Sequence, residues 1–456
     1  MKDDVTPTDQ SFPKLGNKPR GEDLWQRYGA DHDVWNKSML TTLHGRKVRG
    51  KRWFSLIDKV GRMKTLEIAY GKVLSNAGAC GVDGISVAAF DKDSHKRLLA
   101  VNEHIMKGTY QPEAIKRVYI PKAGSSSKRP LGIPIIRDRV VQGALKLVIE
   151  PIFEREFCDN SYGFRPNRGC RDALRQVEEH LGKGHLHVID LDIQGYFDAI
   201  PHEKLLELVK ERISDSKVLG LIKAFLKARV LESGRLSDET TQGSPQGGLI
   251  SPLLANIYLN PLDWLLHGKG SRSVRYADDI VICMDDAESA CTVLEEVRGW
   301  MEKAGLTLHP EKTRIVDMTQ VDAYFDFLGY RFKRSKKGTL MRLIKPGSKK
   351  TLRAKLKGPT RRCNGHSMGV IIAQINITLK GWYGYFKHAR LDELSAIDGW
   401  VRMRLRSILR KRMKKKGRGR GSDHQRWPNR SFEALGLFSL EAAKVREVSL
   451  LKGVKC

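Results

Sequence analysis

The sequence predicts an α+β region that is followed by a basic, all-helical region. Up to about residue 332, short runs of strand-forming residues alternate with segments whose apolar residues recur at helical spacing. Beyond residue 350 only the helical spacing remains, most clearly over 367–388 and 393–416. Charge separates the same two regions. Residues 333–456 hold 33 Lys and Arg against 7 Asp and Glu, which leaves the first 332 residues only +4 of the net charge of +30. This order of elements is typical of an α+β domain with a helical appendage.

The elements of the first region follow from periodicity and from turn residues. Apolar residues at helical spacing predict helices over 53–80, 139–157, 202–213, 249–260 and 287–304. Runs of β-branched and aromatic residues predict strands at 117–121 and 186–193, a hairpin at 273–283, and a strand or hairpin at 327–332. Glycine, serine and proline predict a turn at 79–84 and loops at 122–130 and 242–248.

Bulk composition excludes several classes of protein. The seven cysteines are scattered, odd in number and never spaced as Cys-x-x-Cys, so neither a disulfide framework nor a cysteine zinc site is expected, and a reducing cytoplasm fits. No apolar run approaches the roughly 18 residues that a membrane-spanning helix needs. The N-terminal residues lack the charge and apolar pattern of a signal peptide.

The basic region predicts a polyanionic partner. No Asp or Glu occurs from Phe327 to Leu391, and such a stretch repels itself unless a partner offsets the charge. The alternative is a solvated basic surface. Aromatic residues interleave the charges at 382–386, which favours nucleic acid over a membrane surface.

Two pairs of carboxylates stand where strands are expected to end. Asp190 and Asp192 alternate with apolar residues in one strand, and Asp278 and Asp279 interrupt the hairpin sequence RYADDIVI. The sheet pleat allows Asp192 to project toward Asp278 of a neighbouring hairpin. Carboxylates that converge in this way need cations, and hard oxygen ligands without His or Cys favour Mg²⁺. Two such ions form the clamp of in-line phosphoryl transfer. A surface turn is the alternative for Tyr-Ala-Asp-Asp.

From about residue 65 to 420 the chain resembles the group II intron-encoded reverse transcriptase/maturases of the bacterial type. The resemblance rests on an ordered set of motifs: GVDG (81–84), IPKAGSSSKRPLGIP (120–134), SYGFRP (161–166), DIQGYFD (192–198), GSPQGGLISPLLANIYLN (243–260), YADD (276–279), GLTLHPEKT (305–313), FLGYRF (327–332) and INITLKGWYGYF (375–386).

The resemblance implies a right-hand polymerase, with fingers and palm, followed by an all-α basic thumb/maturase domain. The expected divisions are a flexible leader (1–50), fingers and palm (51–332), the thumb/maturase region (333–420) and a short, DNA-binding C-terminal segment (421–456). The residues after 420 hold one His and one Cys, so a C-terminal HNH endonuclease of the kind that many relatives carry is not expected.

The resemblance also assigns roles around the carboxylates. Asp192 and Asp278 resemble the aspartates that bridge two Mg²⁺ ions, Asp279 resembles the supporting carboxylate, and the backbone carbonyl of Ile193 resembles a further ligand. Lys312 resembles a lysine that protonates the leaving pyrophosphate, a general-acid role. A solvated surface lysine is the alternative for Lys312.

Four positions resemble the binding site for the incoming dNTP. Lys122 and Arg129 match a basic pair that holds the triphosphate, and Lys128 could share that role. Phe197 lies where reverse transcriptases carry an aromatic gate against the ribose 2′-hydroxyl, with a plain core phenylalanine as the alternative. Gln246, in Ser-Pro-Gln-Gly, resembles a residue that contacts the nucleotide.

The remaining candidates are residues expected to contact nucleic acid. Arg165 of SYGFRP either contacts the template or supports the fingers, and support is the preferred interpretation. The candidates in the basic region are Lys380, Trp382, Tyr385, Lys387, Arg402, Arg404 and Arg406. The last three cannot all lie on one helical face, so some of them only solvate the helix.

The function implied is that of an RNA-directed DNA polymerase that extends a primer with dNTPs and binds its intron RNA to assist splicing and retrohoming. The expected partners are group II intron RNA, and an RNA template with a DNA primer or target DNA. A dimer is possible, and no membrane partner is expected. Two alternatives remain open: a non-catalytic RNA-binding maturase, and a retron or diversity-generating type of reverse transcriptase.

Overall fold

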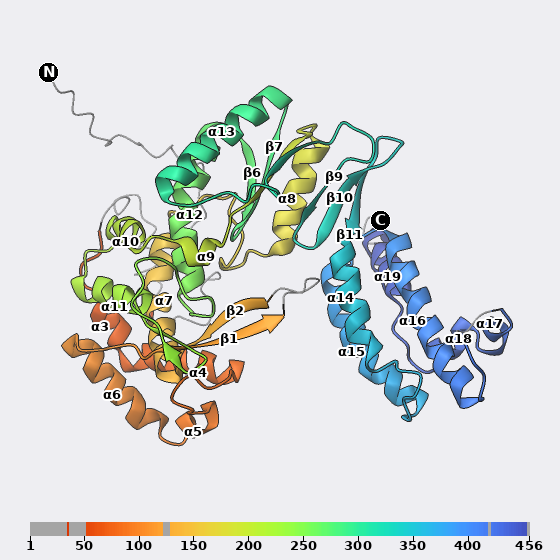
Figure 1. Ribbon diagram of the computed structural model, residues 1–456, viewed down its shortest axis with the longest axis horizontal. Helices are drawn as coiled ribbons and strands as arrows, with labels where there is room; N and C mark the ends of the chain where they lie inside the picture. The colour runs from red at the N-terminus through yellow and green to blue at the C-terminus, as the bar shows by residue number, and fades with distance from the viewer. Residues whose placement is uncertain (1–33, 36–51, 122–127, 418–420, 454–456) are drawn as a thin grey trace. The chain divides into compact units, whose positions relative to one another are not determined.

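The computed structural model describes the chain from residue 52 onward with two short gaps, together with Val34 and Trp35 (Figure 1). The described ranges are 34–35, 52–121, 128–417 and 421–453. The chain forms two compact units. Of the described residues, the first unit contains those up to Ile120 and Lys128–Asp317, and the second contains those from Met318 onward. In this division the 327–332 segment belongs to the second unit.

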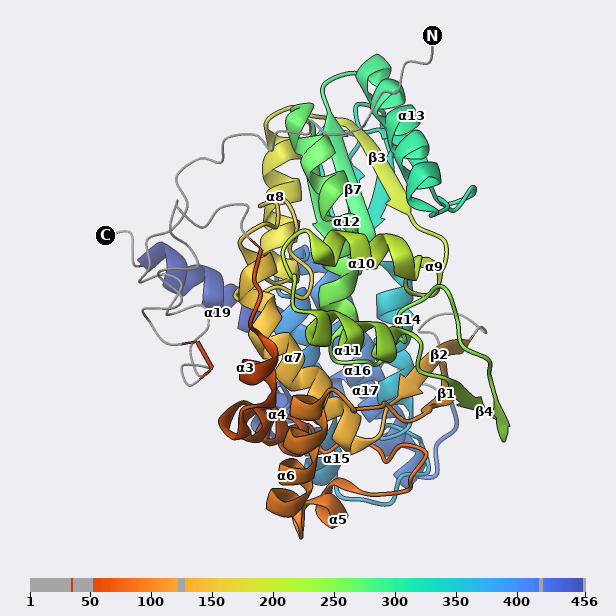
Figure 2. The same cartoon turned by 90° about the vertical axis from the view of Figure 1, so that its left-hand side faces the viewer.

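A four-stranded antiparallel sheet forms the centre of the first unit. Its order is β6 (Arg272–Tyr276), β7 (Asp279–Met284), β3 (His187–Asp192) and β8 (Arg314–Asp317). Val188, Ile189 and Leu191 of β3 are buried because β3 is a central strand. The sheet packs against α8 (Cys170–Gly182), α12 (Ser251–Gly268) and α13 (Ala287–Ala304) (Figure 2).

Helices and a second sheet make up the rest of the first unit. The helices are α3 (Ile57–Gly61), α4 (Met63–Asn76), α5 (Val87–Asp91), α6 (Ser94–Lys107), α7 (Ile136–Glu154), α9 (Tyr196–Ala199), α10 (His202–Lys210) and α11 (Ser216–Leu226). The sheet has the order β2 (Lys128–Ile133), β1 (Ile115–Pro121), β4 (Val230–Glu232) and β5 (Arg235–Leu236).

Several elements differ from their predicted ranges, and three of these differences concern more than the position of an end. The single helix predicted over 53–80 is two helices, because Arg62 between them adopts an extended backbone with ψ 129°. Residues 128–130, predicted as loop, begin strand β2. The helix predicted over 249–260 continues to Gly268 with Pro261 inside it. The leader predicted over 1–50 lies outside the described residues, except for Val34 and Trp35, which are buried.

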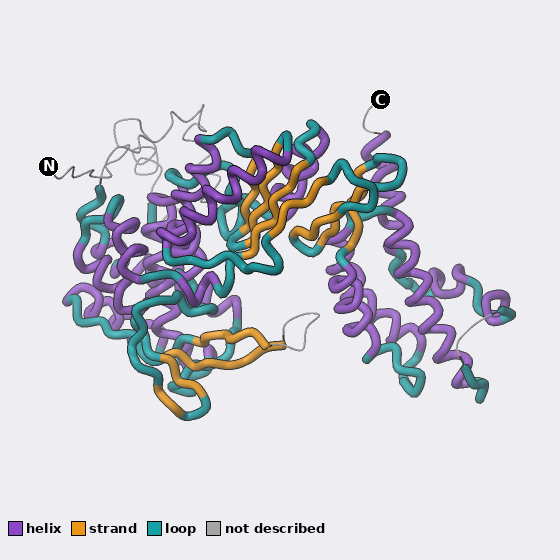
Figure 3. Tube along the Cα trace, turned by 45° about the horizontal axis from the view of Figure 1, so that its top comes forward, coloured by secondary structure: helices purple, strands orange, loops and turns teal. Residues whose placement is uncertain are grey.

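The second unit combines a small sheet with helices. Its sheet has the order β11 (Leu340–Ile344), β10 (Tyr330–Arg334) and β9 (Tyr324–Phe327), seen as one of the strand groups in Figure 3. Leu328 and Gly329 join β9 to β10 with φ values of 46° and 80°, the combination that a type I′ hairpin turn requires. The helices are α14 (Pro346–Lys357), α15 (Met368–Phe386), α16 (Leu391–Arg412), α17 (Asp423–Arg426), α18 (Asn429–Ala434) and α19 (Leu440–Gly453).

The C-terminal helices are bound to the rest of the second unit. The buried carboxylate of Asp398 on α16 accepts hydrogen bonds from the backbone N–H groups of Leu440 and Glu441 and from the Ser439 hydroxyl. It thereby satisfies amide donors at the start of α19, which would otherwise lack partners. The segment after residue 420 is thus packed on the helical domain.

Within the described ranges, no helix is both long and apolar enough to cross a membrane.

Candidate active site

The hairpin β6–β7 and the central strand β3 bring three carboxylates to one end of the first unit's main sheet. Asp192, the last residue of β3, lies directly opposite Asp279, the first residue of β7. Residues directly opposite in an antiparallel pair project to the same face. Asp278 occupies the two-residue turn before Asp279, and Ala277 holds that turn with a φ of 58°, a value that glycine usually supplies. Asp192, Asp278 and Asp279 therefore lie at the same end of this sheet.

Lys312 lies at the same end of the sheet. Its Nζ is 2.8 Å from Asp192 Oδ2. The segment that carries it is anchored to β3, because the His309 N–H donates to the Asp192 carbonyl over 2.7 Å. An ammonium group therefore stands beside one of the gathered carboxylates.

The environment of Asp278 favours a neighbouring cation. Burial raises the pKa of the Asp278 carboxyl, and the negative charge of Asp192 raises it further, whereas the positive charges of Arg129 and Arg275 lower it. Arg129 is exposed near the start of β2, and its charge acts on Asp278. Lys122, its predicted partner in holding triphosphate, lies outside the described residues.

A buried arginine, which the motif search did not single out, supports the turn. Arg275 is fully buried, and its guanidinium binds the Asp263 carboxylate at 2.7 Å through Nε. Its Nη1 donates to Asn256 Oδ1 at 2.9 Å and to the Ala277 carbonyl at 3.0 Å. Because Asp263 and Asn256 both belong to α12, this network fixes the turn to that helix. Asp263, a charged residue inside the largely apolar helix α12, is the sequence signal that could have indicated a buried ion pair.

Gly163 of SYGFRP lies directly against the same turn. A Cβ at this position would collide with the Ala277 backbone nitrogen and approach the Tyr276 carbonyl carbon to 3.0 Å. The Gly163 carbonyl also accepts a hydrogen bond from Asn256 Nδ2 at 2.8 Å. The backbone of the SYGF segment thus packs against Tyr276 and Ala277, the two residues that precede Asp278.

The Ser-Pro-Gln-Gly loop lies beside β2 and α9. The Gly132 N–H donates to the Gln246 carbonyl at 2.6 Å, and the Ser244 N–H donates to the Phe197 carbonyl at 2.6 Å. A Cβ at Gly247 would collide with the Gly132 carbonyl oxygen, so only glycine fits there. Phe197 is partly buried and packs against the main core, with its ring 5.5 Å from that of Tyr196. Phe197 and Gln246 therefore lie on segments that are bonded to each other, and the segment of Gln246 is also bonded to β2.

The donor set suits a hard divalent cation. The Asp192 carbonyl accepts a hydrogen bond from the His309 N–H. Successive carbonyls of an extended strand point in opposite directions. The carbonyl of Ile193 therefore points away from the His309 segment, toward the side of β3 on which β7 lies. In the described chain, no group of three or more His, Cys, Asp and Glu side chains lies close enough to hold a metal alone. Mg²⁺ is usually bound through one or two carboxylates with water and substrate phosphates, so Asp192, Asp278 and the Ile193 carbonyl fit it.

Arg165 is buried and supports the fold. Its Nε and Nη2 bind the Glu154 carboxylate at 3.0 Å and 2.8 Å, and its Nη1 donates to the carbonyls of Cys158 and Ser161. A guanidinium used in this way is not available to a template, and the geometry agrees with the preferred interpretation of Arg165 as support.

The candidates in the second unit fall into two groups, those that line cavities and those whose side chains bind other parts of the protein. Lys380 is exposed, and with the half-buried Arg402 it lines a cavity of about 810 Å³. Trp382 stacks on Phe386 at 4.5 Å and lines a second cavity of about 660 Å³ that Lys345 also lines. These three candidates therefore line cavities in the described part of the second unit.

The other four candidates contact the protein itself. Tyr385 donates from its hydroxyl to the Leu328 carbonyl at 2.7 Å, and Lys387 pairs with Glu447. Arg404 donates to the Thr360 carbonyl at 2.7 Å. Arg406 is buried and donates to the Trp427 carbonyl at 2.9 Å, so it cannot reach RNA in this structure.

Two family models match the chain. Residues 120–332 match "Reverse transcriptase (RNA-dependent DNA polymerase)". Residues 349–427 match "Group II intron, maturase-specific domain". The first match contains the gathered carboxylates, and the second contains the helices of the second unit from α14 to α17.

Curated relatives share the same regions. The chain is 36% identical over 311 residues to protein YkfC of Escherichia coli K12, which covers 59% of this chain and 80% of that protein. It is 41% identical over 196 residues to the group II intron-encoded protein LtrA of Lactococcus lactis, which covers 43% of this chain and 32% of that protein. It is 29% identical over 383 residues to an uncharacterized 91 kDa protein in the cob intron of Schizosaccharomyces pombe, covering 67% and 46%. The chain therefore spans about a third of LtrA and less than half of the cob intron protein.

A solved structure titled "Partial Cas6-RT-Cas1--Cas2 complex" is similar at 19% identity with a TM-score of 0.36. The similarity covers 54% of this chain and 42% of that chain.

Proposed function

The chain belongs to the group II intron reverse transcriptase/maturase family, and from this premise we propose that it extends a primer 3′-hydroxyl with dNTPs on an RNA template and binds its intron RNA to assist splicing and retrohoming. The observation that carries the polymerase proposal is the register of β3 with β7. It places Asp192 opposite Asp279 and next to the turn that holds Asp278. A non-catalytic maturase would have no need of this arrangement.

Two Mg²⁺ ions would be held by Asp192, Asp278, Asp279 and the Ile193 carbonyl. When bound, they offset the charge of the carboxylates and of the nucleotide phosphates. The raised pKa of Asp278 supports this assignment, because a desolvated carboxylate beside another carboxylate favours a cation.

The protein's own side chains would position the nucleotide. Arg129, whose charge acts on Asp278, would bind the triphosphate, with Lys122 as its expected partner. Gln246 would contact the nucleotide from a loop bonded to β2. Phe197, on the segment bonded to that loop, would exclude a 2′-hydroxyl and so favour dNTPs. Positioning of this kind supplies much of the rate enhancement in phosphoryl transfer.

Lys312 would move the proton. The primer 3′-hydroxyl loses its proton to water, its oxygen attacks the α-phosphate, the bond to pyrophosphate breaks, and the leaving oxygen gains charge. The Lys312 ammonium, 2.8 Å from Asp192, stands close enough to the carboxylates to donate a proton to that oxygen.

The second unit would bind intron RNA and the DNA target. Support comes from the maturase-specific match and from the excess of Lys and Arg after residue 332. The exposed Lys380, with Arg402 and Trp382, supplies the charge and the aromatic surface that RNA recognition uses.

Replacement of the turn aspartate tests the polymerase. In Asp278→Asn the side chain keeps its size but loses its charge, so primer extension on an RNA template should fall by about 10³-fold or more, as for other electrostatic groups at reacting centres. RNA affinity, measured on the same protein by fluorescence anisotropy, should stay unchanged. Asp285→Asn, at the far end of β7, is the control. Extension at the original rate in Asp278→Asn would refute the assignment.

Replacement of charge on the second unit tests the maturase role. Lys380→Gln combined with Arg402→Gln removes two positive charges from one cavity, so splicing of the intron RNA at low magnesium should slow by about tenfold. Primer extension on a preformed duplex is measured in parallel. Splicing that matches the Lys183→Gln control, on the first unit, would exclude this surface from the maturase site.

A further inference from the structure

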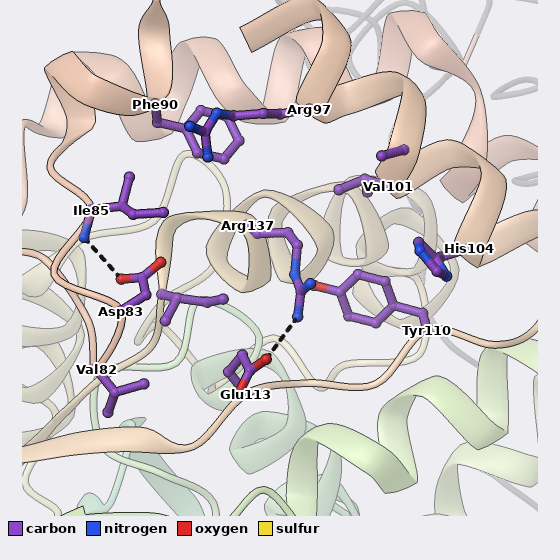
Figure 4. Close-up of a pocket in the computed structure, with 12 residues that line it drawn as sticks. Val82, Asp83, Ile85, Phe90, Arg97, Val101, His104, Tyr110, Glu113 and Arg137 are labelled. Atoms are coloured by element: carbon purple, nitrogen blue, oxygen red, sulfur yellow. Dashed lines mark hydrogen bonds and ion pairs between the residues drawn. The ribbon is translucent and has the colours of Figure 1, made fainter. Parts of the chain in front are cut away.

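A cavity of about 480 Å³ lies in the first unit (Figure 4). It is lined by the segment 82–85, by α5 and α6, by residues 110–113 and by the start of α7. Its volume falls within the range of small-ligand sites. None of its lining residues belongs to the candidate active site.

Arg97 projects into this cavity with little to bind it. Its guanidinium carbon lies 5.3 Å from the centre of the Phe90 ring, which covers one face of the group, as Figure 4 shows. Its Nε is buried and has no hydrogen-bond partner among the described residues. A desolvated guanidinium nitrogen without a partner is costly unless a ligand supplies one.

Arg137 repeats this arrangement on another wall. Its guanidinium carbon lies 5.2 Å from the centre of the Tyr110 ring. Its Nη2 donates to the Gln111 carbonyl at 3.1 Å and lies 3.7 Å from Glu113. Its Nε is also buried, lies 3.8 Å from Asp138 Oδ1 and makes no hydrogen bond in the described chain. Two guanidinium groups, each within 5.3 Å of the centre of an aromatic ring, therefore line the same cavity.

Among the described residues, Arg97 has no carboxylate within salt-bridge distance, whereas Arg137 lies 3.7 Å from Glu113 and 3.8 Å from Asp138. The carboxylate of Asp83, which also lines the cavity, accepts a hydrogen bond from the Ile85 N–H at 3.1 Å. A single phosphodiester carries one negative charge, which matches one unpaired guanidinium better than the several charges of a free nucleoside triphosphate.

We propose that this cavity binds one unpaired nucleotide of an RNA strand. The phosphodiester pairs with Arg97, and the base stacks on the guanidinium plane of Arg137, the way in which single-stranded RNA bases are commonly held. The site would hold the strand on the fingers at a point remote from the reacting phosphate, and it gives the first unit an RNA contact of its own.

Binding of a fluorescein-labelled, short single-stranded oligo(U) to the full chain in EDTA tests this inference. EDTA prevents primer extension, so the result does not depend on the polymerase proposal. Arg97→Gln should weaken binding by about tenfold, whereas Lys96→Gln, its neighbour on α6 outside the cavity lining, should change it by about twofold or less. Equal effects of the two substitutions would refute the site.

A second variant fills the cavity without changing charge. Ala100 lines the cavity on α6, and Ala100→Trp should weaken oligo(U) binding as much as Arg97→Gln while both arginines remain. Oligo(U) that contains 4-thiouridine should crosslink to peptides within 82–113, and both variants should lose this crosslink. Crosslinks confined to other peptides would overturn the proposal. Loss of the crosslink on adding uridine monophosphate or inorganic phosphate at the oligonucleotide's own concentration would assign the cavity to a free ligand instead.

Discussion

Asp138, at the start of α7, is a buried carboxyl that two neutral donors bind and that lies 3.8 Å from Arg137 Nε. It accepts hydrogen bonds from the Tyr110 hydroxyl at 2.5 Å and from the Glu113 N–H at 2.9 Å. Burial raises its pKa to about 6, against a lowering by those hydrogen bonds and by the charge of Arg137. The folded protein therefore holds a proton at this site over a pH range in which the unfolded chain has released it.

This pKa predicts how stability depends on pH. Because the folded pKa lies above 3.8, the ordinary value for an aspartate, the contribution of Asp138 is fully present below about pH 4 and is lost as pH rises through about 6. The loss amounts to about 3 kcal/mol, since each pKa unit is worth about 1.4 kcal/mol. In urea titrations, the free energy of unfolding of Asp138→Asn should rise by about 3 kcal/mol relative to that of the original chain between pH 4 and pH 7.

The exposed carboxyl of Glu203 gives the control for that measurement. Glu203→Gln should leave the pH dependence unchanged, because its side chain stays in water. If the difference between Asp138→Asn and the original chain were flat across this range, the Asp138 carboxyl would titrate normally in the folded state.

At the scale of elements, the hairpin β6–β7 depends on a buried ion pair. Removing one partner of such a pair leaves the other charge buried, at a cost of about 3–5 kcal/mol. Arg275→Met should therefore lower the free energy of unfolding by about this amount in urea titration. It should also slow primer extension, since the Ala277 carbonyl loses the donor that holds the turn.

The matched substitutions separate burial from charge. Arg298→Met removes an exposed arginine that lies 3.3 Å from Glu295 and should cost about 1 kcal/mol or less. Arg275→Met combined with Asp263→Leu should recover part of the stability, because no charge is then left buried. A single variant as stable as the Arg298→Met control would contradict the role given to Arg275.

The elements themselves were largely predictable, whereas their contacts were not. The helix predicted over 287–304 is α13 to the residue, and the hairpin predicted over 273–283 spans β6 and β7, because local periodicity decides both. The local sequence pattern does not indicate that a helix is interrupted at Arg62 or that α12 continues past Pro261.

The same distinction applies to the site. Asp192 and Asp278 could be paired from motifs that lie at strand ends. The structural role of Arg275 depends on Asp263 of α12 and could be read only once helix and strand were side by side. Arg406 was expected to contact nucleic acid because it lies in a basic helix. In the structure its guanidinium donates to the Trp427 carbonyl. Composition alone does not indicate which face of a helix is buried.

At the scale of the whole molecule, the excess of positive charge predicts salt-dependent RNA binding. If the chain neutralises about 6–10 phosphates, its affinity for a structured RNA should fall by about 10³–10⁵ between 50 and 200 mM salt. Anisotropy of a labelled RNA hairpin across that range measures the slope. An affinity that barely changes would mean that contacts other than phosphate contacts dominate.

The same titration can locate the charges that matter. Lys380→Gln and Arg402→Gln should each reduce the slope of log affinity against log salt concentration by about one, as expected for the loss of one phosphate contact. Lys183, directly after α8, is exposed and paired with Glu179, and Lys183→Gln should leave that slope unchanged.

The network around Arg275 also has a consequence for inheritance. Asp263, Asn256 and Gly163 each meet the turn or its arginine, so a change at any one of them leaves a buried group without its partner or brings atoms into collision. A lineage can leave this arrangement only through an unstable intermediate or through simultaneous changes. Across descendants of this gene, these positions should therefore be kept or replaced together, as one hereditary unit.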